Sequence, residues 1–370
     1  MINPNSIYKI KDSVDLFLTD DKFITAYFMN TRQRSSFRVN STMVALLETI
    51  NGVLTVDEIC QRMFLDHSVS KESVITVMNT LQEKRIITEI RNVQNILNDE
   101  DMCRYARQIN YFSEFCGSEE EGCIAQKKVS SAKVLILGCG AIGGNIAIEL
   151  VMAGVQNITL FDYDSVCESD CSRHLYYRKE YLGLKKVEAL KSELIRINRH
   201  VIVNAIDMVL MPQTDIEDLI ENHDFVINTL DEPYIGYTSS KISRICMKHQ
   251  IPHYIAGGFD AHLASTGELI IPYVTPCVEC YANHFKESLK GWKPLKHPTV
   301  RRDEEIGGLS SMSLFSSSYA CIEILKVLAG IVNQTENYKI RGEFLFQDFS
   351  LTYLDVKRDP ECPICGGDHK

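Results

Sequence analysis

A glycine-rich loop between two buried strands constrains the fold of this chain more than any other feature. Residues 133–137 (KVLIL) form an uninterrupted apolar run, which is typical of a strand buried on both faces. The segment GCGAIGG follows, then a helical pattern over residues 145–153 that Gly154 ends, then a second apolar run over residues 157–161. This order predicts one complete βαβ unit.

The same alternation continues along the chain. A helical pattern covers residues 185–198, and apolar runs cover residues 201–206 and 224–228. Strands that alternate with helices predict an α/β fold with a mainly parallel, doubly wound sheet. We therefore expect one large domain over residues 93–370, which begins with a polar, helical connector over residues 93–130.

Residues 1–92 have a different pattern, in which short β-prone runs precede three short helices. Their order predicts a small winged-helix-like α+β domain. Its simplest interpretation is a dimerisation appendage; DNA binding is disfavoured because the last helix is mixed in charge. Thr55 and Ser70 are the expected N-caps of the second and third helices, and Asn51-Gly52 marks the break between the first two helices. The expected strands are 13–18, 23–29 and 36–39, and the expected helices are 43–50, 56–64 and 73–84.

Composition excludes several classes of protein. The net charge of −10 over 370 residues disfavours non-specific binding to nucleic acid or to an anionic membrane. No apolar run reaches the 18 or so residues of a membrane span, and the N-terminus has no signal-peptide core. Thirteen cysteines, an odd number with two CxxC pairs, favour metal binding in a reducing compartment over a disulfide framework. We expect a cytoplasmic protein.

Gly138, Gly140 and Gly143 form a GxGxxG pattern between a strand and a helix. Glycine lets the backbone approach phosphate oxygens, and the N-terminus of the helix favours their negative charge. Asp162, about 20 residues further on, ends the next strand, where it can accept hydrogen bonds from a ribose. The pattern predicts nucleotide binding but does not distinguish NAD from ATP.

Charged residues beyond the loop favour ATP. Arg173 and Lys186 are suited to neutralise a triphosphate, and Asp231, after the strand 224–228, is suited to hold a magnesium ion. A dehydrogenase would need an acid or base at the hydride, and none is identifiable in the sequence.

A series of motifs in fixed order extends this interpretation over residues 100–370. They are RYARQ (104–108), LGCGAIGGNIA, LFDYD (160–164), SRH (172–174), GLKKVEAL, NTLD, TPCVEC and CPICG. In these motifs the chain resembles the E1-like (ThiF/MoeB) activating-enzyme superfamily, whose members have a Rossmann-like domain and adenylate carboxylates with Mg-ATP.

The resemblance implies roles for individual residues. Asp162 would contact the ribose, Arg173 and Lys186 the phosphates, and Asp231 the metal and the phosphates. Asp164 and Asp170 belong to the same expected nucleotide site, together with the three glycines. Arg107 would reach the ATP of the partner protomer in a homodimer; without the resemblance, Arg104 and Arg107 are surface arginines of a helix. Asp170 departs from the asparagine that is usual in the family. It could ligate magnesium, alter how the phosphates are held, or be a tolerated substitution.

Two CxxC pairs, Cys277/Cys280 and Cys362/Cys365, supply the four thiolates of a closed structural zinc site. Because Cys280 and Cys362 are far apart in the sequence, such a site would attach the C-terminus to the preceding domain. A redox-active CxxC pair is the alternative interpretation. Residues 281–314, the loop expected to cross the active site, contain no cysteine, so a thioester step has no support. Cys171 is the nearest candidate acceptor by position, and packing as a small buried residue is its other interpretation.

The segment between residues 281 and 314 is also basic and glycine-flanked. It could attract an acidic peptide, steady phosphates or close over a substrate, or it could be a solvated loop. Its cluster consists of Trp292, Lys293, Lys296, His297, Arg301 and Arg302.

The N-terminal module resembles the PqqD-like element that recognises precursors of modified ribosomal peptides. In that mode a leader peptide adds a strand to a sheet edge, for which residues 23–29 and 36–39 are the candidates. The whole arrangement is similar to the activating enzymes for microcin C7-type and pantocin A-type peptides. It implies ATP-dependent activation, by adenylation or phosphorylation, of a carboxylate on a ribosomal precursor peptide. Asp170 and the basic loop favour glutamate side chains, over the C-terminal carboxyl group, as the carboxylates that the enzyme activates. The alternatives are an activator of sulfur-carrier or ubiquitin-like proteins, and a non-catalytic peptide-binding scaffold.

Overall fold

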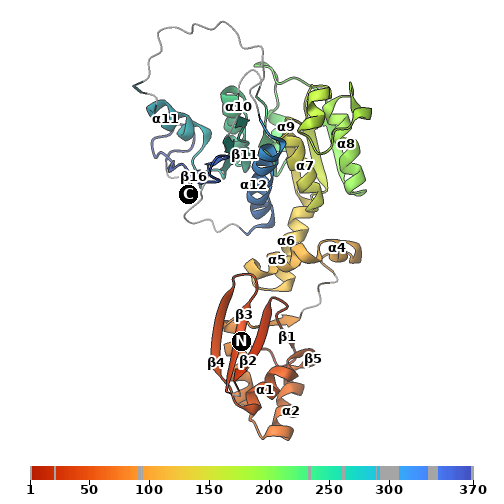
Figure 1. The fold of residues 1–370 in the computed structure, drawn as a ribbon, viewed down its shortest axis with the longest axis vertical. Coiled ribbons are helices and arrows are strands. Elements are labelled where there is room, and N and C mark those ends of the chain that lie inside the picture. Colours follow the sequence, from red (N-terminus) through yellow and green to blue (C-terminus); the bar gives the residue numbers. More distant parts are fainter. Residues whose placement is uncertain are drawn as a thin grey trace. The chain divides into compact units, whose positions relative to one another are not determined.

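The computed structural model divides into two compact units between Cys123 and Ile124 (Figure 1). It describes residues 2–20, 22–90, 93, 95–231, 235–260, 263–288, 290–291, 308–331 and 341–367. The division falls inside helix α6 (Glu119–Ser131), so the first helices of the connector pack with the N-terminal unit. The domain boundary expected at residues 92/93 stays a prediction.

The first unit contains two small antiparallel sheets and a set of helices. One sheet has the strand order β2-β3-β4 and the other has the order β5-β1-β6. The connector adds α4 (Asp99–Arg104) and α5 (Ala106–Cys116). The other elements are β1 (Ile7–Ile10), β2 (Val14–Asp20), β3 (Phe23–Phe28), β4 (Gln33–Arg38), α1 (Ser41–Thr49), β5 (Asn51–Thr55), α2 (Val56–His67), α3 (Lys71–Glu83) and β6 (Ile87–Ile90).

Two helices of this unit, α2 and α3, begin at the caps expected from the sequence. Thr55 and Glu58 form a reciprocal capping box at the start of α2, and Ser70 accepts a hydrogen bond from the amide of Ser73 at the start of α3. Buried residues of α1, α2 and α3 form a common core with the strands; its fully buried members include Tyr8, Val56, Ile59, Met63, Val74 and Met78.

The strand order corrects one expectation about the edges. β3 pairs with β2 on one side and with β4 on the other, so residues 23–29 are not an edge strand. β4 is an edge of this sheet, as expected of residues 36–39. Asn51-Gly52 lies between α1 and α2, as expected, and begins strand β5, which the sequence did not predict. Gly52 has a φ of 81°, a left-handed conformation that glycine adopts without strain.

The second unit is built on a six-stranded sheet with the order β14-β11-β10-β7-β8-β9. The strands β11, β10, β7, β8 and β9 are parallel, and β14 pairs antiparallel with β11 at the edge. This confirms the doubly wound α/β fold. The elements are β7 (Lys133–Leu137), α7 (Gly143–Met152), β8 (Asn157–Phe161), α8 (Lys186–Ile197), β9 (Ile202–Ile206), α9 (Glu217–Glu221), β10 (Phe225–Asn228), α10 (Ile235–Lys248), β11 (His253–Ile255) and β14 (Glu268–Ile270).

Helices cover both faces of this sheet. On one face, Leu135, Leu137 and Val226 pack in a buried cluster with Ile220 of α9 and Ile242 of α10. The helices α7, α8 and α12 (Ser310–Ala329) lie side by side in the same unit (Figure 1). Alternate strand residues therefore face different helical layers, which explains why the strands are apolar throughout.

A small antiparallel sheet and two helices complete the second unit. The sheet has the order β12-β13-β15-β16. Helix α12 is, among the described residues, the one helix long and apolar enough to span a membrane by length and composition. It packs against α7, and Ser317 donates a hydrogen bond to the carbonyl of Ile142. These elements are β12 (Phe259–Asp260), β13 (Leu263–Ser265), α11 (Val278–Ser288), α12 (Ser310–Ala329), β15 (Gly342–Leu345) and β16 (Leu351–Tyr353).

Candidate nucleotide site and cysteine cluster

The expected nucleotide-binding residues meet at the carboxyl end of the parallel sheet. The strand order reverses between β7 and β10, and the crevice at such a switch point is where ligands bind in doubly wound sheets. Gly138 follows β7, Asp162 follows β8 and the exposed Asp231 comes soon after β10. The fold therefore brings three separate motifs to one edge.

Glycine is required at two positions of the loop. Gly138 has a φ of 97°, and a Cβ atom there would lie 2.3 Å from Oγ1 of Thr229. At Gly143 a Cβ atom would lie 2.1 Å from the carbonyl oxygen of Gly138. Gly140, in contrast, faces open space. The loop is thus folded tightly against the segment after β10 while its outer side stays accessible to a phosphate.

Asp162 braces this loop. One carboxylate oxygen accepts a hydrogen bond from the amide of Cys139 at 2.6 Å, and the other accepts one from the amide of Asp164 at 2.8 Å. Burial raises the pKa of the Asp162 carboxyl, and the two amides oppose that effect by stabilising the charged form. Asp162 therefore fixes the loop, besides the expected contact with a ribose.

Asp170 is buried at the centre of an ionic network. Its Oδ1 lies 3.5 Å from the guanidinium of Arg173 and 3.7 Å from Nζ of Lys186, which also lies 3.1 Å from Asp164. Burial raises the pKa of the Asp170 carboxyl, but the amide and thiol of Cys167 and the nearby Lys186 outweigh it and lower that pKa overall. The extra negative charge at this position is thus compensated by the two cations expected to bind phosphates.

The positive charge of Lys186 is stabilised by the carboxylates of Asp170 and Asp164. Burial alone would lower the pKa of its ammonium group, but Asp170 and Asp164 raise it above the usual value. A buried cation close to the glycine loop can neutralise a phosphate without the screening of bulk water.

The remaining expected residues have different surroundings. Arg107 is exposed on α5, in the first unit. Cys171 is half-buried in the turn that carries Asp170, and its thiol points to the carbonyl of Cys167 at 3.9 Å. The basic cluster from Trp292 to Arg302 lies outside the described residues.

The sequence did not indicate a role for Tyr176 and Tyr177, which contact the glycine loop on its side facing the protein interior. Both are buried, and their hydroxyls donate hydrogen bonds to loop carbonyls. The available signal was the aromatic pair that follows the SRH motif after one intervening residue, Leu175.

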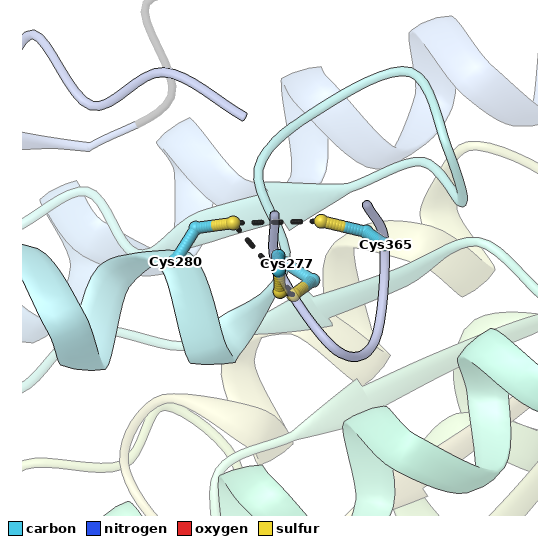
Figure 2. A group of neighbouring side chains, drawn as sticks. Cys277, Cys280 and Cys365 are labelled. Atoms are coloured by element: carbon cyan, nitrogen blue, oxygen red, sulfur yellow. Dashed lines mark hydrogen bonds between the residues drawn. The ribbon is translucent and has the colours of Figure 1, made fainter. Parts of the chain in front are cut away.

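The four cysteines of the two CxxC pairs form one buried cluster. Cys277 and Cys280 lie at and within the first turn of α11, and Cys362 and Cys365 come from the turn near the C-terminus. In Figure 2 the sulfur atoms of Cys277, Cys280 and Cys365 point toward one another. The sequence motif is therefore assembled in space, as expected.

The distances fit a tetrahedral metal better than a disulfide. The Sγ atoms of Cys277 and Cys362 are 3.6 Å apart, and those of Cys280 and Cys365 are 3.4 Å apart. Four thiolates about 2.3 Å from a zinc ion are about 3.8 Å from one another, whereas a disulfide needs about 2.05 Å. All four ligand atoms lie within 4.8 Å of one another, so the cluster could hold a zinc ion.

The larger part of the chain matches the model of a known protein family. The model of the ThiF family matches residues 105–364, a range that contains the glycine loop, the ionic network and the first three cysteines of the cluster. The chain belongs to the ThiF family. It is therefore an ATP-dependent enzyme of the E1-like type.

Curated relatives of this ThiF-family protein include the molybdopterin-synthase adenylyltransferase of Escherichia coli, 26% identical over 73% of this chain and 98% of that protein. Protein HesA of Nostoc sp. is 27% identical over 67% of this chain and 90% of that protein.

Solved structures share the fold over nearly the whole length. Escherichia coli MccB, solved with AMPCPP and MccA, superposes with a TM-score of 0.70 at 18% identity, over 97% of this chain and 99% of that chain. PaaA superposes with a TM-score of 0.69 at 21% identity, over 94% of this chain and 100% of that chain. These likenesses include the N-terminal unit, most of which precedes the region matched by the ThiF model.

Proposed function

We propose that this ThiF-family enzyme uses ATP to activate a carboxylate on a ribosomally made precursor peptide. The observation that carries the proposal is the combination of two units in one chain. The second has the glycine loop and ionic network of a nucleotide site, and the first is an additional small α+β unit with open sheet edges. MccB, whose fold is similar over both units, was solved with MccA and the nucleotide AMPCPP.

The chemistry follows from the charges of the site. A carboxylate oxygen attacks a phosphorus atom of ATP and forms an acyl-adenylate with release of pyrophosphate, or an acyl-phosphate with release of ADP. A nucleophile within the peptide then displaces AMP or phosphate and gives a modified or cyclised product. The glycine loop, Arg173 and Lys186 position the phosphates and neutralise the charge that develops on them.

Two metals fit the donor groups of the chain. Asp231 is an exposed carboxylate at the carboxyl edge of the sheet and would hold Mg²⁺, which would neutralise phosphate charge. Cys277, Cys280, Cys362 and Cys365 would hold a zinc ion. Because four thiolates leave no open coordination position, that zinc would be structural.

The proposal is tested with short peptides encoded beside the gene. Each is incubated with the enzyme and Mg-ATP, and the peptide mass and the nucleotide products are measured. We expect one peptide to stimulate ATP consumption and to lose water or gain AMP, and we expect Asp231→Ala to abolish both changes. ATP consumption that no peptide alters would contradict the peptide part of the proposal.

A sulfur-carrier substrate is the second candidate, because the sequence relatives include a molybdopterin-synthase adenylyltransferase. Such a substrate would be a folded protein with a flexible Gly-Gly tail. Recovery of a β-grasp protein bound to the enzyme, with adenylation of its C-terminus, would favour this candidate over a short peptide.

We further propose that the precursor adds a strand at the β4 edge. This edge carries the exposed Arg34 and Arg38, whereas the opposite edge strand β2 carries Asp15. A basic edge favours an acidic peptide over a basic one. An acidic peptide is consistent with activation of glutamate side chains rather than of a C-terminal carboxyl group.

Reversal of the β4 charges tests this docking site. In Arg34→Glu/Arg38→Glu we expect the KM for the cognate peptide to rise at least tenfold, with little change in the KM for ATP, because only the peptide meets this edge. Arg62→Glu, which changes an exposed arginine of α2, is the matched control and should leave both constants near the wild-type values. Equal effects of the two variants would exclude β4 as the docking edge.

We also propose a homodimer in which Arg107 acts on the nucleotide of the partner protomer. Arg107, Tyr111 and Phe115 are spaced four residues apart along α5 and are all exposed, so they form one stripe. Mixing inactive Arg107→Ala with inactive Lys186→Ala should restore activity if the arginine acts in trans, and should not restore it if the arginine acts within its own chain.

A further inference from the structure

Two buried tyrosines bind the glycine loop by its carbonyl groups. Tyr176 donates its hydroxyl to the carbonyls of Gly140 at 2.8 Å and Cys139 at 3.1 Å. Tyr177 donates to the carbonyl of Cys139 at 3.0 Å and lies 3.4 Å from the carbonyl of Lys186. Only 1% of Tyr176 and 5% of Tyr177 is exposed, so these carbonyls point into the protein.

The position of the tyrosine pair is fixed by its neighbours. A Cβ atom at Gly144 would lie 1.6 Å from the Tyr176 hydroxyl, so the tyrosine packs directly on the first turn of α7. The ring of His174 packs on both tyrosines, at centroid distances of 5.4 Å and 4.8 Å. Its Nδ1–H donates to the carbonyl of Asp170 at 2.6 Å, which connects the pair to the turn that carries the ionic network.

The opposite side of the loop presents its amides. Within the described part of the chain, the backbone amides of Gly140, Ala141 and Ile142 have no hydrogen-bond acceptor. They lie at the start of α7, and nothing surrounds the position of a Cβ atom at Gly140. Amides with this arrangement are donors for an anion such as a phosphate.

We propose that Tyr176 and Tyr177 are positioning residues of the nucleotide site, a role that rests on the proposed use of ATP. A peptide unit that turns its carbonyl inward turns its amide outward, because the two groups are antiparallel within one planar unit. The tyrosine hydroxyls hold the carbonyl of Cys139 inward and, together with the amide of Gly144, the carbonyl of Gly140, which keeps the amides of Gly140 and Ala141 directed at the phosphates. Without the hydroxyls, the loop can rotate a carbonyl dipole toward the triphosphate and repel it.

Tyr176→Phe and Tyr177→Phe test the proposal, because each removes a hydroxyl and keeps the ring. Binding of Mg-ATP and of adenosine is measured by calorimetric titration. We expect each variant to lose about tenfold in affinity for ATP, the effect of one buried hydrogen bond of about 1.4 kcal/mol, with unchanged affinity for adenosine. Tyr254→Phe is the control, since Tyr254 is also buried and donates its hydroxyl to a carbonyl, that of Thr266.

The outcomes separate this role from simple stabilisation and from the proposed function. Unchanged ATP affinity in both variants, an equal loss for adenosine, or an equal loss in Tyr254→Phe would overturn the positioning role. Wild-type protein that does not bind ATP would instead overturn the proposed function. Should a variant not fold, hydrogen exchange of the wild type decides: Mg-ATP is expected to protect the amides of Gly140, Ala141 and Ile142, and absence of protection contradicts the proposal.

Discussion

Lys186→Ala is expected to lower the rate of ATP-dependent activation by about 10² to 10³, the usual cost of removing one fixed charge that stabilises a transition state. Lys186 is also the cation nearest to Asp164, and it compensates Asp170 together with Arg173. Its loss would leave these carboxylates facing the triphosphate with less compensation. Both the KM for ATP and kcat should therefore suffer, and the measurement is steady-state kinetics with saturating peptide.

The neighbouring lysine supplies the control for this prediction. Lys185 has the same charge, but its ammonium group pairs with Asp207 at 3.0 Å and donates to the carbonyl of Tyr163. Lys185→Ala should keep near-wild-type kinetics. Similar losses in the two variants would indicate a general effect of net charge and would contradict the assignment of Lys186 to the phosphates.

Cys365→Ser is expected to remove the metal and to destabilise the second unit by several kcal/mol. The cluster joins the start of α11 to the C-terminal turn, and a structural zinc ion contributes its binding free energy directly to folding. We expect one zinc ion per wild-type chain by elemental analysis, none in the variant, and a large fall in Tm of the variant. A chelator should have the same effect on the wild type.

A cysteine outside the cluster provides the comparison. Cys246 of α10 is fully buried and packs in the core beside the sheet, so Cys246→Ala should retain zinc and lose only about 1 kcal/mol. Wild-type protein without bound zinc, or a Cys365→Ser variant as stable as Cys246→Ala, would contradict a structural metal site.

The parts of the fold that the sequence predicted are those with strong local patterns. Buried parallel strands are apolar throughout, so β7, β8 and β10 were identifiable within one or two residues, and Thr55 and Ser70 were identifiable as caps. The four cysteines were predicted from spacing because each pair is local. Only the meeting of the two pairs depends on tertiary structure.

The parts that were missed depend on partners distant in the chain. Residues 23–28 have the same alternation whether the strand is central or at an edge, so only the pairing of β3 with both neighbours decides its place. Tyr177 reaches Cys139 across 38 positions, and no local pattern indicates that contact. The sequence predicted an added negative charge at Asp170, because the positions of its compensating cations, Arg173 and Lys186, depend on tertiary structure.

Transfer of oxygen from the peptide to the nucleotide products tests the central claim most directly. The cognate peptide is labelled with ¹⁸O in its carboxylates and incubated with enzyme and Mg-ATP, and the nucleotide and phosphate products are analysed by mass spectrometry. Attack of a carboxylate on ATP predicts one ¹⁸O atom in AMP for an acyl-adenylate, or in phosphate for an acyl-phosphate. Modified peptide formed without ¹⁸O in either product would contradict the account.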